Sequence, residues 1–183
     1  MTILHIDSSI NGENSASRKL TAVIVDRLKA SNWGQEILYR DLAANPVPHL
    51  TLDAFAQNHD LQEFLAADTI VIGAPMYNFT LPSQLKAWID RIVVAGQTFR
   101  YTEHGPEGLA NGKRVIVALA RGGFYDPGSP AGALGHLETY LRGVFNFIGV
   151  EPEFVAADGL NISAEQRETA LALAVGETVR LAA

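Results

Sequence analysis

The sequence contains no cysteine, so disulfide bonds, thiolate metal ligands and thiol catalysis are all excluded. Its 14 lysines and arginines are outnumbered by 20 aspartates and glutamates and form no basic run. We therefore expect neither nucleic acid nor an anionic membrane as a partner. No stretch of 18 uninterrupted apolar residues occurs, and the first residues form neither a charged leader nor a long apolar core. These absences predict a cytoplasmic protein without a membrane-spanning helix.

Several catalytic signatures are also missing. The five histidines show neither an H-E-x-x-H motif nor i, i+4 pairing, so we expect no metal site. The G-x-S-x-G elbow of a large hydrolase class is absent. The phosphate-binding pattern G-x-x-x-x-G-K-[S/T] and the dinucleotide pattern G-x-G-x-x-G are absent as well. Any phosphate site in this chain must therefore be built in another way.

What the chain does have is a regular alternation of strand and helix signals. With 183 residues, 48% of them apolar, we expect one domain, residues 1–183, with a sizeable core. Short β-branched runs predict strands, and amphipathic or capped stretches predict helices between them. The strands are expected at 3–7, 36–39, 69–72, 113–120 and 153–156, and the helices at 17–30, 60–67, 82–93, 133–148 and 163–181.

This alternation predicts an α/β fold, a doubly wound parallel sheet with helices on both faces. Five strands most simply adopt the flavodoxin-like order 2-1-3-4-5. In that order the loops after strands one and three meet at the carboxyl edge of the sheet, where open sheets bind ligands. We therefore predict that residues 8–17 and 76–79 face one crevice.

The first of these loops is rich in hydroxyl groups. Ser8, Ser9, Ser15 and Ser17 surround Gly12 just before a predicted helix. A helix N-terminus offers free N–H groups and the positive end of the helix dipole, so this loop favours a phosphate dianion. A single phosphate suits a mononucleotide such as FMN. The alternative is that Ser15 or Ser17 merely caps the helix while the other serines contact water.

The second loop consists of Met76, Tyr77, Asn78 and Phe79. A flat redox ring needs an apolar slot, aromatic walls and polar groups for its heteroatoms, and this loop supplies all three. The Asn78 amide offers both a donor and an acceptor. The alternative is an ordinary turn in which Tyr77 and Phe79 pack into the core.

A third loop follows the fourth strand, in the run Ala120, Arg121, Gly122 and Gly123. The two glycines let the backbone approach a ligand closely, and the N–H groups of 121–123 are candidates to stabilise the pyrimidine edge of a reduced flavin. Arg121 either lies near that edge or is a surface residue.

Three further aromatic residues are candidates for a substrate pocket, although each is equally consistent with a loop anchor. Phe99 and Tyr101 lie in the segment 95–112, which we expect to be a long loop, and Phe124 follows the double glycine.

Eight stretches of the chain match one protein family in order. They are SSINGENSAS, RDLAANPVP, APMYNF, QLKAWID, AGQTFRYTEHGPEGL, GKRVIV, ARGGFY and FNFIGV. With these stretches the chain resembles the FMN-dependent NADH:quinone oxidoreductases, also called azoreductases, of the flavodoxin-like superfamily. The stretch TFRYTE-x-GPEGL is the most specific to this branch.

The resemblance implies one non-covalent FMN, a homodimer, and transfer of two electrons from NADH or NADPH to quinones or azo compounds. Because the donor and the acceptor would stack on the same face of the flavin ring in turn, we expect ping-pong kinetics. The family's motif implies that the phosphate and ribityl end of FMN is held by Ser9, Ser15, Ala16 and Ser17. It also implies that residues 76–79 and 120–123 line the ring.

The chain also departs from the family pattern. Residues 50–60 form a shorter segment than the family usually has, which predicts a wider acceptor pocket with Phe55 as its one aromatic wall in that segment. Ala16 and Ala120 stand where polar side chains are common. A second function remains open, namely a flavodoxin-like electron carrier for a protein partner. The long segment 95–112 favours the enzyme, because it could wall a substrate pocket.

Overall fold

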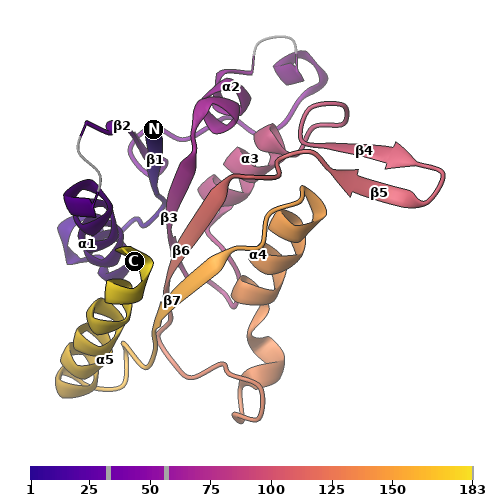
Figure 1. The fold of residues 1–183 in the computed structure, drawn as a ribbon. Coiled ribbons are helices and arrows are strands. Elements are labelled where there is room, and N and C mark those ends of the chain that lie inside the picture. Colours follow the sequence, from indigo (N-terminus) through magenta and orange to yellow (C-terminus); the bar gives the residue numbers. More distant parts are fainter. Residues whose placement is uncertain (32–33, 56–57, 183) are drawn as a thin grey trace.

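A parallel sheet of five strands lies at the centre of the molecule (Figure 1). The computed structural model describes residues 1–31, 34–55 and 58–182. The strands are β1 (Thr2–Asp7), β2 (Glu36–Asp41), β3 (Thr69–Pro75), β6 (Arg114–Ala120) and β7 (Glu153–Ala157). Their order is β2-β1-β3-β6-β7, and all neighbours are parallel. The predicted α/β class and flavodoxin-like order are confirmed.

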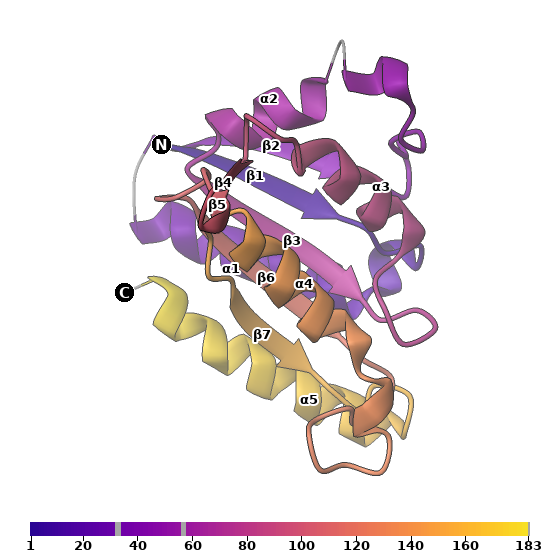
Figure 2. The same ribbon diagram turned by 90° about the vertical axis from the view of Figure 1, so that its right-hand side faces the viewer.

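Helices cover both faces of this sheet (Figures 1 and 2). One face carries α1 (Ala16–Ser31) and α5 (Ala164–Glu177), and the other carries α2 (His59–Ala66), α3 (Ser83–Ile92) and α4 (His136–Phe147). The 3-10 turns are η1 (Gly12–Asn14), η2 (Leu52–Phe55), η3 (Gly132–Leu134) and η4 (Thr178–Ala182). Each predicted helix is present, although η3 and η4 replace the expected α-helical ends at 133 and 181. None of the helices in the described residues has the length and apolarity that a bilayer crossing requires.

The central strand β3 is buried along its whole length. Alternate side chains of a strand point to opposite faces, so β3 feeds two cores. Ile70 and Ile72 pack in the cluster that contains Trp88 of α3, whereas Val71 packs in the cluster that contains Ile24 of α1. A continuous β-branched run is what a strand covered on both faces requires.

β3 extends three residues beyond the predicted end at 72, through Gly73 and Ala74 to Pro75. The ladder to β6 continues to the Pro75–Ala120 pair, so turn-forming residue types do not end the strand here. Gly73 fits because a Cβ at this position would lie 2.7 Å from Oδ1 of Asp7. A close approach between strand and side chain explains this glycine better than a turn does.

The expected loop at 95–112 contains an antiparallel hairpin, β4 (Phe99–Thr102) and β5 (Gly105–Gly108). The hairpin lies at the end of the sheet where the strands begin, opposite the carboxyl edge (Figure 2). The chain that leaves it bonds Ala110 N–H to the Ile148 carbonyl, just after α4. Strands of four residues, one of them Gly-Pro-Glu-Gly, carry too little alternation to be predicted.

Gly108 anchors the hairpin on the body of the protein. A Cβ at this position would lie 2.1 Å from the backbone nitrogen of Gly149, which cannot move aside. We expect Gly108→Ala to lower the free energy of unfolding by about 1–3 kcal/mol or more. The matched control is Gly143→Ala in α4, where nothing lies within 4 Å of the new methyl group. It should raise stability by about 0.5–1 kcal/mol. Urea unfolding of both variants measures the difference, and equal effects would contradict close docking of the hairpin.

Candidate functional site

The hydroxyl group of Tyr77 joins the two loops that were predicted to meet. It lies 3.3 Å from Oγ of Ser9 and accepts a hydrogen bond of 3.1 Å from the backbone N–H of Ile10. Ser8, next to Ser9, donates a hydrogen bond of 2.6 Å to the carbonyl of Gly73 in β3. The structure therefore confirms that loops 8–17 and 76–79 face one crevice at the carboxyl edge.

The serine loop is a buried cluster of hydroxyl groups at the start of α1. Ser8, Ser9, Ser15 and Ser17 are all at most 1% exposed. Ser15 caps α1, because its Oγ accepts from the N–H of Arg18 at 3.2 Å. Ser17 Oγ lies 3.1 Å from Ser15 Oγ. The prediction that Ser15 caps the helix is therefore confirmed. The prediction that the other serines contact water is wrong, because all of them are buried. Ser15 and Ala16 line the cavity described below, so the positive end of the α1 dipole lies at the crevice, and no acidic side chain in the first turn offsets it.

Arg18 joins the serine loop to the end of β2. Its guanidinium donates two hydrogen bonds, of 2.7 and 2.8 Å, to the carboxylate of Asp41 at the end of β2. It also donates to the carbonyl of Ser9 at 2.7 Å. The hydrogen bond from Arg18 holds the pKa of Asp41 below its usual range, and the same bond raises the pKa of Arg18. A paired arginine therefore fixes the backbone that carries Ser9.

The aromatic loop is a strained turn. Tyr77 and Thr80 exchange both backbone hydrogen bonds, and the two residues between them, Asn78 and Phe79, have φ of 46° and 72°. Positive φ at both central positions defines a type I′ turn, which favours Asn-Gly. Phe79 occupies the glycine position and is 42% exposed, so it is not packed as core. Strain of this kind in a cleft is a common mark of a functional residue.

Arg121 is neither a surface residue nor directed into the crevice. It is 4% exposed and donates two hydrogen bonds, of 2.5 and 2.6 Å, to Asp158. Burial acts to lower the pKa of Arg121, but the bond and charge of Asp158 outweigh it and raise the pKa. Its backbone N–H donates to the Ala157 carbonyl in the sheet. The Arg121 N–H is thus already used within the sheet. Of the three N–H groups predicted to donate to a flavin, only those of Gly122 and Gly123 are left as candidates.

A polar cavity of about 90 Å³ lies where these loops converge. Among the predicted residues it is lined by Ser9, Ser15, Ala16, Met76, Tyr77, Ala120 and Gly122. Ser17, Asn78, Phe79, Arg121 and Gly123 are adjacent in the chain but do not line it. The sequence did not identify five lining residues, which are Asn11, Pro75, Leu160, Asn161 and Arg167. The last three follow β7, which neighbours β6 in the sheet. Ligands of open α/β sheets bind at the carboxyl ends of the strands, so the loop after β7 could have been predicted in the same way as the other loops.

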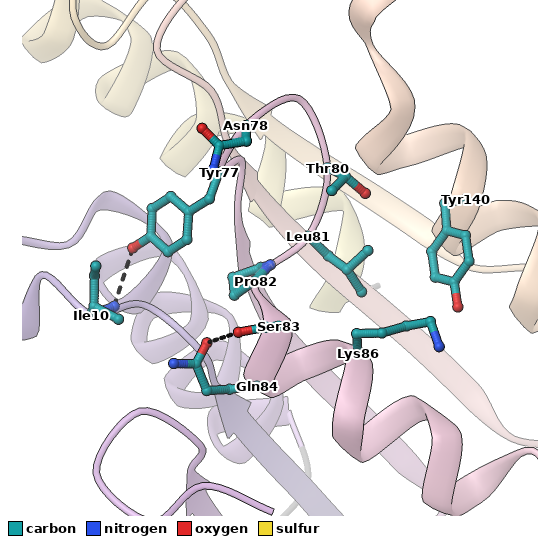
Figure 3. Close-up of a pocket in the computed structure, with 10 residues that line it drawn as sticks. All are labelled: Ile10, Tyr77, Asn78, Thr80, Leu81, Pro82, Ser83, Gln84, Lys86 and Tyr140. Carbon is teal, nitrogen blue, oxygen red and sulfur yellow. Dashed lines mark hydrogen bonds between the residues drawn. The ribbon is translucent and has the colours of Figure 1, made fainter. Parts of the chain in front are cut away.

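A larger hollow of about 610 Å³ adjoins this cavity and shares Tyr77 with it (Figure 3). It runs from Ile10 past Leu81 to Lys86 of α3 and Tyr140 of α4. Lys86 is paired with Asp90 on α3. The hollow falls within the usual size of small-molecule pockets.

The three aromatic candidates for a substrate pocket are not brought together at the crevice of one chain, although the rings of Phe99 and Tyr101 contact each other with centroids 5.4 Å apart. Phe99 is 8% exposed, and its ring centroid lies 4.6 Å from that of Phe147 at the far end of α4. Tyr101 is 74% exposed on the hairpin, also at the edge away from the crevice. Phe124 is 47% exposed and lies beside Gly159 at the carboxyl edge. Of the three, only Phe124 stands near the crevice of its own chain.

The short segment 50–60 is bonded to α3. Arg91, which is 8% exposed, donates to the carbonyls of Pro48 and Ala54, and Asn58 donates to the Arg91 carbonyl at 2.6 Å. The side chain of Phe55, expected as a wall, lies outside the described residues. A wider acceptor pocket stays a prediction.

The comparisons with known proteins agree with this geometry. The model of a family described as having a flavodoxin-like fold matches residues 1–181. The chain is 53% identical to the FMN-dependent NADH:quinone oxidoreductase of Rhizobium meliloti (strain 1021), with 100% of both chains covered. The chain belongs to this family. It is also 54% identical, over 100% of both chains, to an enzyme of that name from Methylorubrum extorquens. These alignments span 206 and 202 positions, more than the 183 residues here, so the relatives carry residues that this chain lacks.

Solved structures give the same result. An azoreductase from Bacillus anthracis str. Sterne superposes with a TM-score of 0.90 at 25% identity, over 100% of this chain and 98% of that one. An FMN-dependent NADH-azoreductase from Bacillus anthracis str. Ames Ancestor, solved in complex with FMN, gives 0.86 at 26% identity over 100% of both chains.

The Arg18–Asp41 pair makes the stability of the serine loop depend on pH. Because the pKa of Asp41 is lowered by folding, the pair stabilises the protein above the unfolded pKa of about 3.9 and ceases to do so as the pH falls through the folded pKa. We expect Asp41→Asn to cost about 1.5–3 kcal/mol at pH 7, and the cost to shrink below about pH 4. Thermal unfolding from pH 3 to pH 7 measures it. Asp26→Asn, on the exposed side of α1, should show no such trend, and a pH-independent cost for Asp41→Asn would contradict the ion pair.

Proposed function

We propose that this protein is an FMN-dependent enzyme that transfers two electrons from NADH to quinones and azo compounds. The observation that carries the proposal is the polar cavity in which Tyr77 joins a hydroxyl-rich helix N-terminus to a strained aromatic turn. The names of the relatives, which specify FMN, NADH and quinone, support it.

The residues of the cavity fit the phosphate end of FMN. Buried hydroxyls, together with the free N–H groups of a helix start, match the acceptor oxygens of a phosphate dianion. Ser9 and Ser15 would bind this group through their hydroxyls, and the Ala16 N–H would replace a polar side chain at that position. Ser17 does not line the cavity and would support Ser15 through the contact of 3.1 Å between their hydroxyl oxygens. A glycine at position 122 is also needed to form this cavity. A Cβ there would lie 2.5 Å from Nδ2 of Asn161 and would force the two loops apart.

The remaining loops suit the ring. Met76 and the turn at 77–79 would form one wall, while the N–H groups of Gly122 and Gly123 would donate to its polar edge. When bound, FMN supplies the capacity to take two electrons from NADH and give them to an acceptor. The protein binds and orients the reactants in turn, so we expect ping-pong kinetics.

The electron-carrier alternative is less well supported. The relatives with more than 50% identity carry enzyme names. Segment 95–112 does not wall the substrate pocket of its own chain, because the hairpin that it forms lies at the opposite edge of the sheet (Figure 2). The hairpin supports the enzyme only through a second copy of the chain.

We infer a homodimer in which each hairpin completes the acceptor site of the other subunit. Asn78 and Phe79 are exposed at the crevice, so the described residues of the same chain leave one side of the proposed ring site uncovered. Tyr101 is the matching feature, an aromatic side chain presented on a well-docked hairpin. A twofold axis would place both contacts at once.

The first experiment tests the cofactor and the reaction together. Purified protein reconstituted with FMN should keep the flavin absorption bands through desalting. It should oxidise NADH quickly when a quinone is present and slowly without one. Double-reciprocal plots at several quinone concentrations should be parallel. Loss of flavin on desalting, or a clear preference for FAD, would refute the proposal.

A second experiment tests the shared site. We expect Tyr101→Ala to raise KM for the quinone about tenfold, the equivalent of ~1.4 kcal/mol of lost contact, with the FMN dissociation constant unchanged. Leu173→Ala, which removes an exposed side chain from α5, is the matched control and should leave KM unchanged. Sedimentation should show a dimer for the wild type, for Tyr101→Ala and for Leu173→Ala. A monomer with full turnover would rule out the shared site.

A further inference from the structure

Three arginines surround the crevice, and two of them are neutralised within the chain. Arg18 is bound to Asp41 through two hydrogen bonds, and Arg121 is bound in the same way to Asp158. Arg167 differs, because no carboxylate among the described residues lies within 4 Å of it. Its positive charge is therefore the one of the three that has no counter-charge in the described part of the chain.

Arg167 reaches the serine loop from a distant part of the sequence. It lies in the first turns of α5, a helix capped by Ser163, whose Oγ accepts from the Gln166 N–H at 3.0 Å. Its Nη2 donates a hydrogen bond of 2.8 Å to the carbonyl of Asn14, directly before Ser15. The side chain is half-buried and lines the polar cavity together with Ser9, Ser15 and Ala16.

The cavity otherwise offers a phosphate only neutral donors. Hydroxyls and backbone N–H groups can bind a dianion, but they do not cancel its charge, and the chain as a whole carries a net charge of −6. A guanidinium has five N–H donors, and the bond to Asn14 uses one of them. Charge-assisted hydrogen bonds from arginine to phosphate are about twice as strong as neutral ones.

We propose that Arg167 binds the phosphate of FMN across this cavity and thereby makes the chain select the phosphorylated flavin over riboflavin. The inference rests on the proposed function for the identity of the ligand. The hydrogen bond from Arg167 to the Asn14 carbonyl holds the guanidinium against the serine loop, so its positive charge lies at the N-terminus of α1 before the ligand binds.

A purely structural role would look different. If Arg167 only held the Asn14 carbonyl in place, its loss would loosen the loop and weaken every flavin that touches it. Binding would then depend little on salt. If it binds the phosphate, the loss should be confined to ligands with a phosphate and should shrink as ionic strength rises, because salt screens a partly exposed charge.

The test compares Arg167→Gln with Arg180→Gln. Arg180 is a matched control, since it also donates to a backbone carbonyl, that of Phe154, but lies outside the cavity. Titration of the flavin-free proteins, followed by quenching of flavin fluorescence, gives dissociation constants for FMN and riboflavin. We expect Arg167→Gln to weaken FMN binding about 10- to 100-fold and to change riboflavin binding less than about twofold. Arg180→Gln should match the wild type for both ligands, and Arg167→Lys should recover part of the FMN affinity.

A second measurement does not use flavin. Inorganic phosphate should raise the melting temperature of the flavin-free wild type and of Arg180→Gln, but raise that of Arg167→Gln much less. Equal FMN affinity in wild type and Arg167→Gln would overturn the inference, as would an equal loss for FMN and riboflavin. If the wild type binds no FMN at all, the proposed function fails and this assignment fails with it. If the wild type binds FMN and Arg167→Gln binds it equally well, only this assignment fails.

Discussion

The carboxylate of Asp7 is the point on which the site depends. It ends β1, is 3% exposed, and accepts hydrogen bonds from Thr21 of α1 and Tyr39 of β2. A buried charge is costly unless donors satisfy it, so these bonds fix the helix and the edge strand against β1. Burial, together with the nearby Asp7 charge, raises the pKa of Tyr39 to about 12, which keeps its phenol a donor. The serine loop begins at the next residue, Ser8, so the hydrogen bonds of Asp7 fix the position from which this loop starts.

The same carboxylate constrains the neighbouring strand. Gly73 leaves space for Oδ1 of Asp7, and the Gly73 carbonyl accepts from Ser8. A larger residue at position 73 would push β3 from β1 and separate Ser9 from Tyr77. The strained turn after β3 is held by similar means, since the N–H of His136 donates to the carbonyl of Phe79. Two positive φ values cost of order 1–3 kcal/mol each, and such a turn persists only because its surroundings fix it.

Much of the fold could be predicted from the sequence, because strand order follows from the alternation of strand and helix signals and from handedness. The serine loop and the aromatic turn were found for the same reason, since topology sends both to one edge. The hairpin at 99–108 was not found, because its strands are too short to show a period. The environment of Arg121 was not found either, because its partner Asp158 lies 37 residues away. The positions of Phe99 and Tyr101 relative to the crevice depend on the path of the whole 95–112 segment, which no local pattern encodes.

The polar cavity is assembled from four distant parts of the chain, and Arg167 joins the last of them to the first across 153 residues. During synthesis the serine loop emerges early, but its cavity has no closing wall until β7 and the start of α5 have left the ribosome. A ligand of this cavity therefore cannot stabilise nascent or truncated chains, and acts only on the finished sheet. Because a ligand that binds only the native state shifts the equilibrium by mass action, its supply would govern how long complete chains survive, while fragments remain exposed to proteolysis.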